Sequence, residues 1–219
     1  MPASAEPDST VAQRLAKRGP AVRAAVDDAN RRPELIRAAA RLFREKGFDA
    51  TTVRDIAAAV GMRSGSPFYH FPSKQAMLLA VMEEGLRQGL DKSEAVLARK
   101  LPVREKFRAL VRTHLGIILE DGNDFIPVIL HDWRALDEVH RREIIAMKDR
   151  YDTLWQTMTL ELVRAGLLRG DAKIARLTIL GAMNFTATWY KAGAGLSIDA
   201  LASQIADLFL QGEVARGSE

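Results

Sequence analysis

The spacing of the apolar residues is the feature that most constrains how this chain folds. From about residue 33 onward, apolar side chains recur every three or four positions, as on the buried face of an amphipathic helix. The first such face consists of Leu35, Ile36, Ala39, Leu42 and Phe43. No segment longer than a few residues alternates with the period of two that a strand requires, and no internal repeat is present. The pattern predicts an all-α protein of about nine helices.

The composition excludes several kinds of site. The 219 residues include no cysteine, which excludes a disulfide framework, a thiolate-bound metal and a cysteine nucleophile. His114, His131 and His140 lie too far apart in sequence for two of them to share a helical turn, so we expect no metal and no cofactor. The N-terminus lacks the apolar core of a secretory signal, and no apolar run is long enough to span a membrane. We therefore expect a cytoplasmic protein without a membrane partner.

The sequence also lacks the patterns of an enzyme. Gly65-Ser66 is not followed by the second glycine of a nucleophile elbow, and no strand precedes it. Gly193-Ala194-Gly195 is not followed by the lysine of a phosphate-binding loop. We expect no catalytic residue.

Positive charge is confined to the N-terminal third of the chain. Residues 1–80 hold 13 Lys and Arg against 8 Asp and Glu, whereas residues 81–219 hold 19 against 20. A basic segment on a nearly neutral body indicates a polyanionic partner for that segment. Two alternatives stay open on charge alone: a solvated basic surface, and a helical adaptor or scaffold whose basic end binds an acidic protein.

Residues 51–71 have the order of a helix-turn-helix. Thr52 can cap a first helix, because Asp55 stands at the spacing of a capping box, and Gly61 ends that helix. Ser64 can cap a second, short helix with Pro67 in its first turn, where a missing N–H is tolerated. In a helix-turn-helix the second helix enters the major groove of DNA.

The second helix of this segment supplies the candidates for reading DNA. Ser66, Tyr69 and His70 would be free to meet DNA, whereas Phe68 and Phe71 would face inward or along the backbone.

The region from about residue 33 to residue 82 resembles the TetR family of transcriptional regulators. The residues that carry the resemblance are Ala39, Leu42, Phe43, Gly47, Phe48, Thr51, Thr52, Ile56, Ala57, Gly61, Gly65, Tyr69, His70, Phe71, Ser73 and Lys74. It implies an N-terminal three-helix domain that binds operator DNA and a C-terminal helical domain that binds a small ligand and forms a homodimer. We place these domains at residues 31–80 and 81–219, after a flexible basic arm at residues 1–30.

The resemblance also implies roles for individual residues. It gives DNA contacts to Thr52, Ser66, Tyr69, His70 and Lys74. Pro67 and Phe68 depart from the family, which usually has Leu or Ile and often Tyr at these places. We add Arg63 to the DNA-binding set, because it could replace the phosphate contact of the missing tyrosine hydroxyl.

The C-terminal half indicates an effector. Residues 184–190, 193–197 and 205–210 are similar to a branch of repressors of fatty-acid and sterol-side-chain breakdown that respond to acyl-CoA thioesters. This implies a hydrophobic effector, an acyl-CoA or fatty acid, that releases the protein from its operator. Arg134 could bind a carboxylate or phosphate of the ligand, or form an ordinary surface pair with Asp132. The expected ligand-binding set is Trp133, Arg134, Tyr151, Met158, Asn184, Thr188 and Trp189, although each apolar member could equally be plain core.

The last two helices are the expected seam of the homodimer. They fall near residues 171–190 and 197–211 and combine apolar residues with the small residues Gly181, Ala182 and Ala187, which permit close helix packing.

Overall fold

The computed structural model describes residues 31–120, 122 and 124–211. The expected N-terminal arm at residues 1–30 lies outside the described residues. The elements are α3 (Arg32–Lys46), α4 (Val53–Ala59), the 3₁₀ turn η1 (Ser66–Tyr69), α5 (Lys74–Leu97), α6 (Val103–Leu119), α7 (Phe125–Asp132), the 3₁₀ turn η2 (Trp133–Ala135), α8 (Glu138–Arg164), α9 (Ala172–Trp189) and α10 (Ile198–Phe209). The all-α prediction is confirmed: the described part of the chain forms eight α-helices and two 3₁₀ turns, without a strand.

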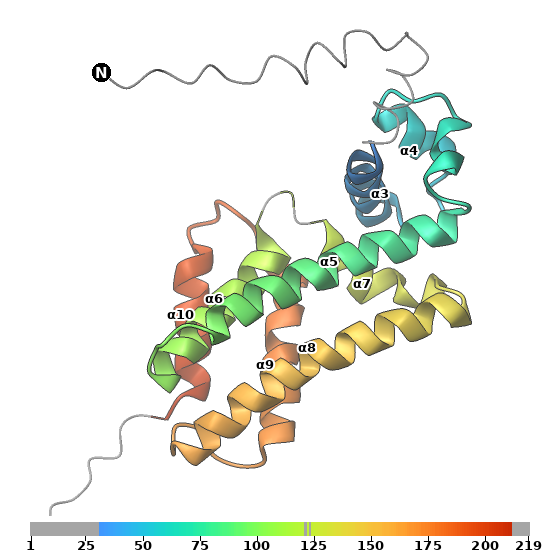
Figure 1. The fold of residues 1–219 in the computed structure, drawn as a ribbon. Coiled ribbons are helices and arrows are strands. Elements are labelled where there is room, and N and C mark those ends of the chain that lie inside the picture. Colours follow the sequence, from blue (N-terminus) through green and yellow to red (C-terminus); the bar gives the residue numbers. More distant parts are fainter. Residues whose placement is uncertain (1–30, 121, 123, 212–219) are drawn as a thin grey trace, which may run out of the picture.

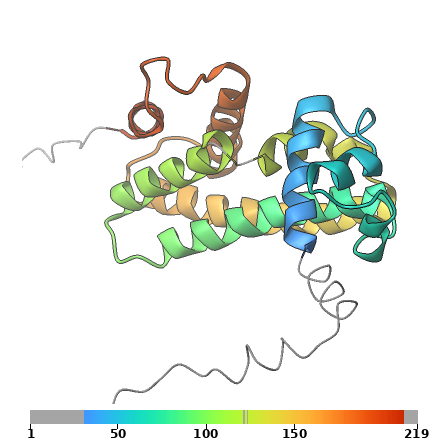
Figure 2. The same cartoon turned by 90° about the horizontal axis from the view of Figure 1, so that it is seen from above.

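Helix α5 connects the two ends of the molecule. Figures 1 and 2 show α3, α4 and η1 gathered at one end of this helix and α10 at the other. Helix α8 packs along α5 over much of its length. The boundary that we expected after residue 80 falls inside α5, so this helix takes part in both halves of the protein.

Two hydrophobic cores follow one another along α5. The first joins α3 and α4 to the N-terminal half of α5, and Phe43, Ile56 and Phe71 are buried in it. It also takes in α7 and the start of α8, so the N-terminal unit rests on the C-terminal body through apolar contacts. The second core lies among α6, α8, α9 and α10 around Trp155, whose ring meets Phe107 edge-on at 6.4 Å between centroids.

Helices α5 and α7 approach closely at a glycine. A Cβ atom added at Gly85 would lie 2.7 Å from Cβ of Phe125 and 3.0 Å from Cδ1 of Ile129. Only glycine therefore allows this separation of the two helices, and α7 also packs against α3 and α6.

None of the described helices combines the length and the apolar character that a membrane span requires.

Candidate nucleic-acid interface and ligand cavity

Helix α4 is the first helix of the predicted helix-turn-helix and is called the brace helix below. It begins with the predicted capping box. Oγ1 of Thr52 accepts a hydrogen bond from the backbone N–H of Asp55 at 3.1 Å, and the carboxylate of Asp55 accepts one from the backbone N–H of Thr52 at 3.0 Å. The hydrogen bonds that this carboxylate accepts from the backbone N–H and from the hydroxyl of Thr52 lower the pKa of Asp55. The box fixes the entry of the chain into α4 and leaves Thr52 exposed at its N-terminus.

The second element of the predicted helix-turn-helix, called the reading turn below, is a single 3₁₀ turn. We expected a short helix capped by Ser64, but the turn η1 begins after Gly65 and has no side-chain cap. Its bonds run from the N–H of Phe68 to Gly65 and from the N–H of His70 to Pro67. Pro67 has no N–H to donate, which suits the first turn, and residues three apart lie on one face of a 3₁₀ helix. Ser66 and Tyr69 therefore share a face.

The side chains of this turn differ widely in exposure. Tyr69 is 87% exposed and Phe68 is 54% exposed, whereas Phe71 is buried. We expected both phenylalanines to face inward or along the backbone; Phe71 faces inward, whereas Phe68 does not. Arg63, Gly65, Ser66, Phe68 and Tyr69 line one shallow hollow on the surface.

The side chain of His70 is less exposed to solvent than we expected. Its side chain is half-buried, and its Nε2 atom is shielded from solvent without a hydrogen-bond partner in the described residues. The turn thus brings Ser66, Tyr69 and Arg63 to one surface and leaves Nε2 of His70 behind it.

Lys74 is directed toward the protein. Its ammonium group donates hydrogen bonds to the backbone carbonyl oxygens of Phe48 at 2.8 Å and Thr51 at 2.9 Å, with a longer contact of 3.4 Å to Asp49. It also lies 4.1 Å from the centroid of the Phe48 ring. An ammonium group has three protons, so these three carbonyls use them all. These bonds tie the start of α5 to the connection before α4, and we infer from them a positioning role for Lys74 in place of the phosphate contact that we expected.

Sequence reasoning missed one basic residue at this interface. Arg54 is exposed on α4, two positions after Thr52, and forms no ion pair within the part of the chain that the structure describes. Arg54 could have been predicted from the sequence, because a basic residue in the first turn of the brace helix lies close to the capped N-terminus.

A small cavity lies between α5, α6, α7 and α8. Its wall is apolar apart from two side chains and consists of Gly85, Leu86, Gly89, His114, Ile117, Ile118, Ile126 and Tyr151. Its volume of about 40 Å³ is enough for a few water molecules but well below the usual size of a ligand pocket. A ligand larger than this must push the helices apart.

The two polar residues of the cavity belong to a hydrogen-bonded chain across three helices. The hydroxyl of Tyr151 on α8 lies 2.7 Å from Nδ1 of His114 on α6, and Nε2 of His114 lies 3.1 Å from Oδ1 of Asn184 on α9. His114 is 6% exposed, and its burial lowers its pKa to about 4. Tyr151 and Asn184 were predicted as ligand-binding residues, and the structure joins them through His114, which we had not predicted for the ligand site.

The other expected ligand-binding residues lie elsewhere. Met158 is fully buried in the second core, and Thr188 and Trp189 are exposed on α9. Trp133 packs against the first core, and the guanidinium of Arg134 lies over its ring at 5.8 Å. Helical spacing predicted an inner face but could not say which core each residue would join. The seven residues therefore form no single site, and only Tyr151 is in the cavity wall.

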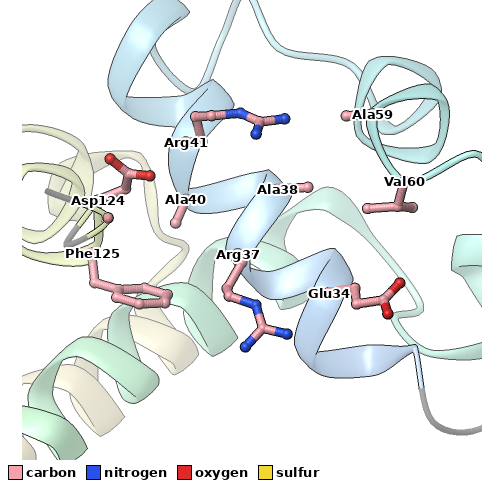
Figure 3. Close-up of a pocket in the computed structure, with 10 residues that line it drawn as sticks. Glu34, Arg37, Ala38, Ala40, Arg41, Ala59, Val60, Asp124 and Phe125 are labelled. Atoms are coloured by element: carbon pink, nitrogen blue, oxygen red, sulfur yellow. The ribbon is translucent and has the colours of Figure 1, made fainter.

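A wider groove crosses α3, with the end of α4 on one side and the segment that leads into α7 on the other. Figure 3 shows Arg37 and Arg41 of α3 projecting along it, with Glu34 at one end and Asp124 at the other side. Its volume is about 420 Å³. The ion pair between Arg44 and Asp124, 2.9 Å long, crosses from α3 to the start of α7 beside it.

Large apolar residues are exposed on both of the last two helices. Ile174, Leu177, Phe185 and Trp189 recur at helical spacing along α9, and Leu208 is exposed on α10. Gly181 and Ala182 are exposed between them on α9, and nothing lies within 4 Å of a Cβ atom added at Gly181. Large apolar side chains grouped in this way are typical of a protein interface.

Comparisons with known proteins agree with this arrangement. Residues 35–81 match the family model described as bacterial regulatory proteins, tetR family, and residues 100–213 match that of the tetracyclin repressor-like, C-terminal domain. The HTH-type transcriptional repressor KstR2 of Rhodococcus jostii is 30% identical over 185 residues, which cover 83% of this chain and 90% of the relative.

Two solved structures show the same fold. Superantigen PfiT is 38% identical with a TM-score of 0.72, over 84% of this chain and 98% of that one. AibR in complex with isovaleryl coenzyme A and operator DNA is 23% identical with a TM-score of 0.73, over 82% of this chain and 98% of that one.

Proposed function

The chain belongs to the TetR family of bacterial transcriptional regulators, and we propose that an acyl-CoA thioester is the ligand that releases it from its operator. As a member of this family it is a ligand-responsive, DNA-binding transcriptional repressor that acts as a homodimer, and it is not an enzyme. The adaptor alternative would not need the capped brace helix and exposed reading turn that the structure contains.

The observation that carries the effector proposal is the cavity inside the C-terminal half. It is lined by apolar residues with a few polar groups, which is the usual character of a small-molecule site. Two comparisons support the chemical class: AibR, which shares the fold, has been crystallised with isovaleryl coenzyme A and operator DNA, and a curated relative from Bacillus subtilis is a fatty acid metabolism regulator. An acyl chain would enter the apolar cavity while the charged coenzyme stays near solvent.

The cavity is well placed to control the DNA-binding half. Gly85, in its wall, packs directly against Phe125 at the start of α7, and Asp124 beside it is paired with Arg44 of α3. A ligand that enlarges the cavity must move α5 relative to α7 and therefore strains the contact with α3. A ligand shifts an equilibrium only by its difference in affinity for the two states, so the DNA-bound form must be the one with the small cavity.

We assign the operator contacts to Thr52, Arg54, Arg63, Ser66 and Tyr69. The last three share the surface of the reading turn, and Thr52 and Arg54 lie exposed at the start of the brace helix. Lys74 holds the segment that leads into α4 in place through its hydrogen bonds to Phe48 and Thr51. We divide the protein into a DNA-binding domain at residues 31–80 and a ligand-binding and dimerisation domain at residues 81–219, and α5 belongs to both. We place the protein in the cytoplasm, where its operator DNA is found.

A twofold dimer through the apolar face of α9 and α10 would present two reading turns to one side of DNA. In dimeric helix-turn-helix proteins the half-sites are about one helical turn, roughly 34 Å, or more apart. We therefore expect an imperfectly palindromic operator.

The test is the effect of acyl-CoAs on a protein–operator complex. The operator is first selected from random duplex DNA by the purified full-length protein. Straight-chain, branched and cyclic acyl-CoAs are then titrated into the complex while fluorescence anisotropy reports bound DNA. We expect release by at least one thioester at low micromolar concentration and none by free coenzyme A. If no thioester binds below about 100 μM, which corresponds to only about −5.5 kcal/mol, the effector class is wrong.

A further inference from the structure

Two glycines of the cavity wall lie one helical turn apart in the interior of α5. Gly85 and Gly89 are both buried, and neither has the positive φ angle that favours glycine. Glycine in the interior of a helix destabilises the helix relative to alanine, because glycine loses more conformational freedom on folding. The presence of glycine at each position therefore requires a reason other than backbone conformation.

The two positions differ in what an added side chain would meet. At Gly85 a Cβ atom would lie 2.7 Å from Cβ of Phe125, so the close packing of α5 against α7 explains this glycine. At Gly89 the nearest atoms would be Cε2 of Tyr151 at 3.5 Å, Cδ2 of Tyr151 at 3.9 Å and Cδ1 of Ile117 at 4.0 Å. These are ordinary van der Waals distances to side-chain atoms, so an alanine would fit. Neither helix packing nor backbone conformation accounts for the glycine at position 89.

What glycine leaves at position 89 is space in the cavity. Gly89, Tyr151 and Ile117 all belong to the cavity wall, so a Cβ atom at position 89 would take up part of the cavity between α5, α6 and α8. The ring of Tyr151 is held opposite Gly89, because its hydroxyl lies 2.7 Å from Nδ1 of His114, which is itself hydrogen-bonded to Asn184. The space beside Gly89 therefore has room for a methyl group and is bounded by carbon atoms, which suits the hydrocarbon part of a ligand.

We propose that the acyl group of the effector occupies the space beside Gly89, so that this glycine sets how large an acyl group the protein accepts. This inference rests on the proposed acyl-CoA effector. Burying one further CH₂ group strengthens binding about fourfold, and a mismatch of one methylene in an apolar pocket changes affinity by about tenfold or more. Alanine at position 89 would therefore stabilise α5 and at the same time reduce the size of the acyl group that fits.

The test measures how the affinity for acyl-CoAs depends on the size of the acyl group in the full-length wild type and in Gly89→Ala. The ligands are straight-chain thioesters from acetyl-CoA to decanoyl-CoA, with branched and cyclic series of increasing size beside them, and calorimetry gives each Kd. We expect the affinity of the wild type to rise with acyl size up to an optimum. In Gly89→Ala the best wild-type ligand should bind about tenfold more weakly and release operator DNA at a correspondingly higher concentration, whereas smaller thioesters keep their affinity.

Unfolding in urea and two further variants separate this effect from general packing. Gly89→Ala should unfold at a higher urea concentration than the wild type, since its methyl group meets no atom closer than 3.5 Å. Gly85→Ala should unfold at a lower one, because its methyl group would meet Phe125 at 2.7 Å. Gln88→Ala is the control for ligand binding, because Gln88 precedes Gly89 on α5 but bonds Glu84 and is not part of the cavity wall. It should leave the dependence of affinity on acyl size unchanged.

The outcomes are distinct. A more stable Gly89→Ala protein that binds only the smaller acyl groups supports the inference. If this variant binds every thioester as the wild type does, no acyl group occupies the space, and the inference is overturned while the proposed function stands. If it weakens every thioester by the same factor, acetyl-CoA included, or unfolds at a lower urea concentration, the methyl group disturbs the packing and the inference is also overturned. If no thioester binds the wild type, the proposed function fails and the inference fails with it.

Discussion

The ammonium group of Lys74 donates a hydrogen bond to the backbone carbonyl of Phe48, which precedes it by 26 residues in the chain. Together with the bond to Thr51, this contact attaches the first residue of α5 to the segment that leads into the brace helix α4. The lysine therefore controls where Thr52 and the capping box sit relative to the core.

Lys74→Met tests this positioning role. The substitution leaves the carbonyls of Phe48 and Thr51 without their donor, and an unpaired buried polar group costs about 1–3 kcal/mol. We expect the free energy of unfolding in urea to fall by that amount and operator affinity to fall with it. The slope of log affinity against log salt concentration should stay unchanged, because no phosphate contact is lost.

The opposite result would restore the phosphate contact that the sequence suggested. In that case stability would be unaffected, and the salt slope of the dimer would fall by about two, one for each half-site.

The elements that sequence could predict are those whose signals are local. The last two helices begin where we expected them, after Asp171 and Ser197, and each of these residues accepts hydrogen bonds from backbone N–H groups in the first turn of its helix. The capping box at Thr52 was likewise visible from a spacing of three. Such contacts join residues within one turn, so periodicity and residue type suffice to find them.

What the sequence could not give are contacts between distant segments. The bond from Lys74 to Phe48 and the joining of Tyr151 to Asn184 through His114 depend on how helices pack against one another. The residues expected to bind ligand were chosen by face and type, which predicts burial but not the partner helix. Met158 was therefore placed at the site although it fills the second core.

Tyr69→Ala should separate DNA reading from stability. The side chain is 87% exposed, so its removal should change the free energy of unfolding by less than about 0.5 kcal/mol. Operator affinity should fall by about tenfold, within the range of about 1–3 kcal/mol for a lost specific contact. Val139→Ala, which removes part of a 65% exposed side chain on α8, is the control and should leave DNA binding unchanged. If the wild type, Tyr69→Ala and Val139→Ala bind the operator with equal affinity, η1 is not part of the DNA interface.

His114 makes stability depend on pH. Its pKa is about 4 in the folded protein and about 6.5 in the unfolded chain, so the unfolded state binds more protons between these values. The stabilisation is present above pH 6.5 and is lost progressively as the pH falls toward 4. Urea unfolding should show a loss of about 2 kcal/mol from this residue between pH 7 and pH 5.

A variant isolates this contribution from that of the carboxylates. The pKa values of Asp55 and Asp137 are also lowered by hydrogen bonds, and these groups lose stability in the same direction at lower pH. His114→Gln keeps a polar side chain but cannot titrate, so its stability should fall by about 2 kcal/mol less than that of the wild type over this range. Parallel pH curves for the two proteins would show that His114 is not held neutral.

Phe185→Glu tests the apolar face of α9 and α10. Phe185 is 65% exposed on α9, and a charged side chain there would have to be buried without a partner if two copies meet through this face. We expect the variant to sediment as a monomer at micromolar concentration and to lose cooperative binding to a two-half-site operator. Val139→Glu is the matched control, because Val139 is also 65% exposed but lies on α8, outside the face. Its dimerisation should be unaffected. If Phe185→Glu remains dimeric while Val139→Glu dissociates, the seam runs along α8 and the two reading turns are presented by a different twofold axis.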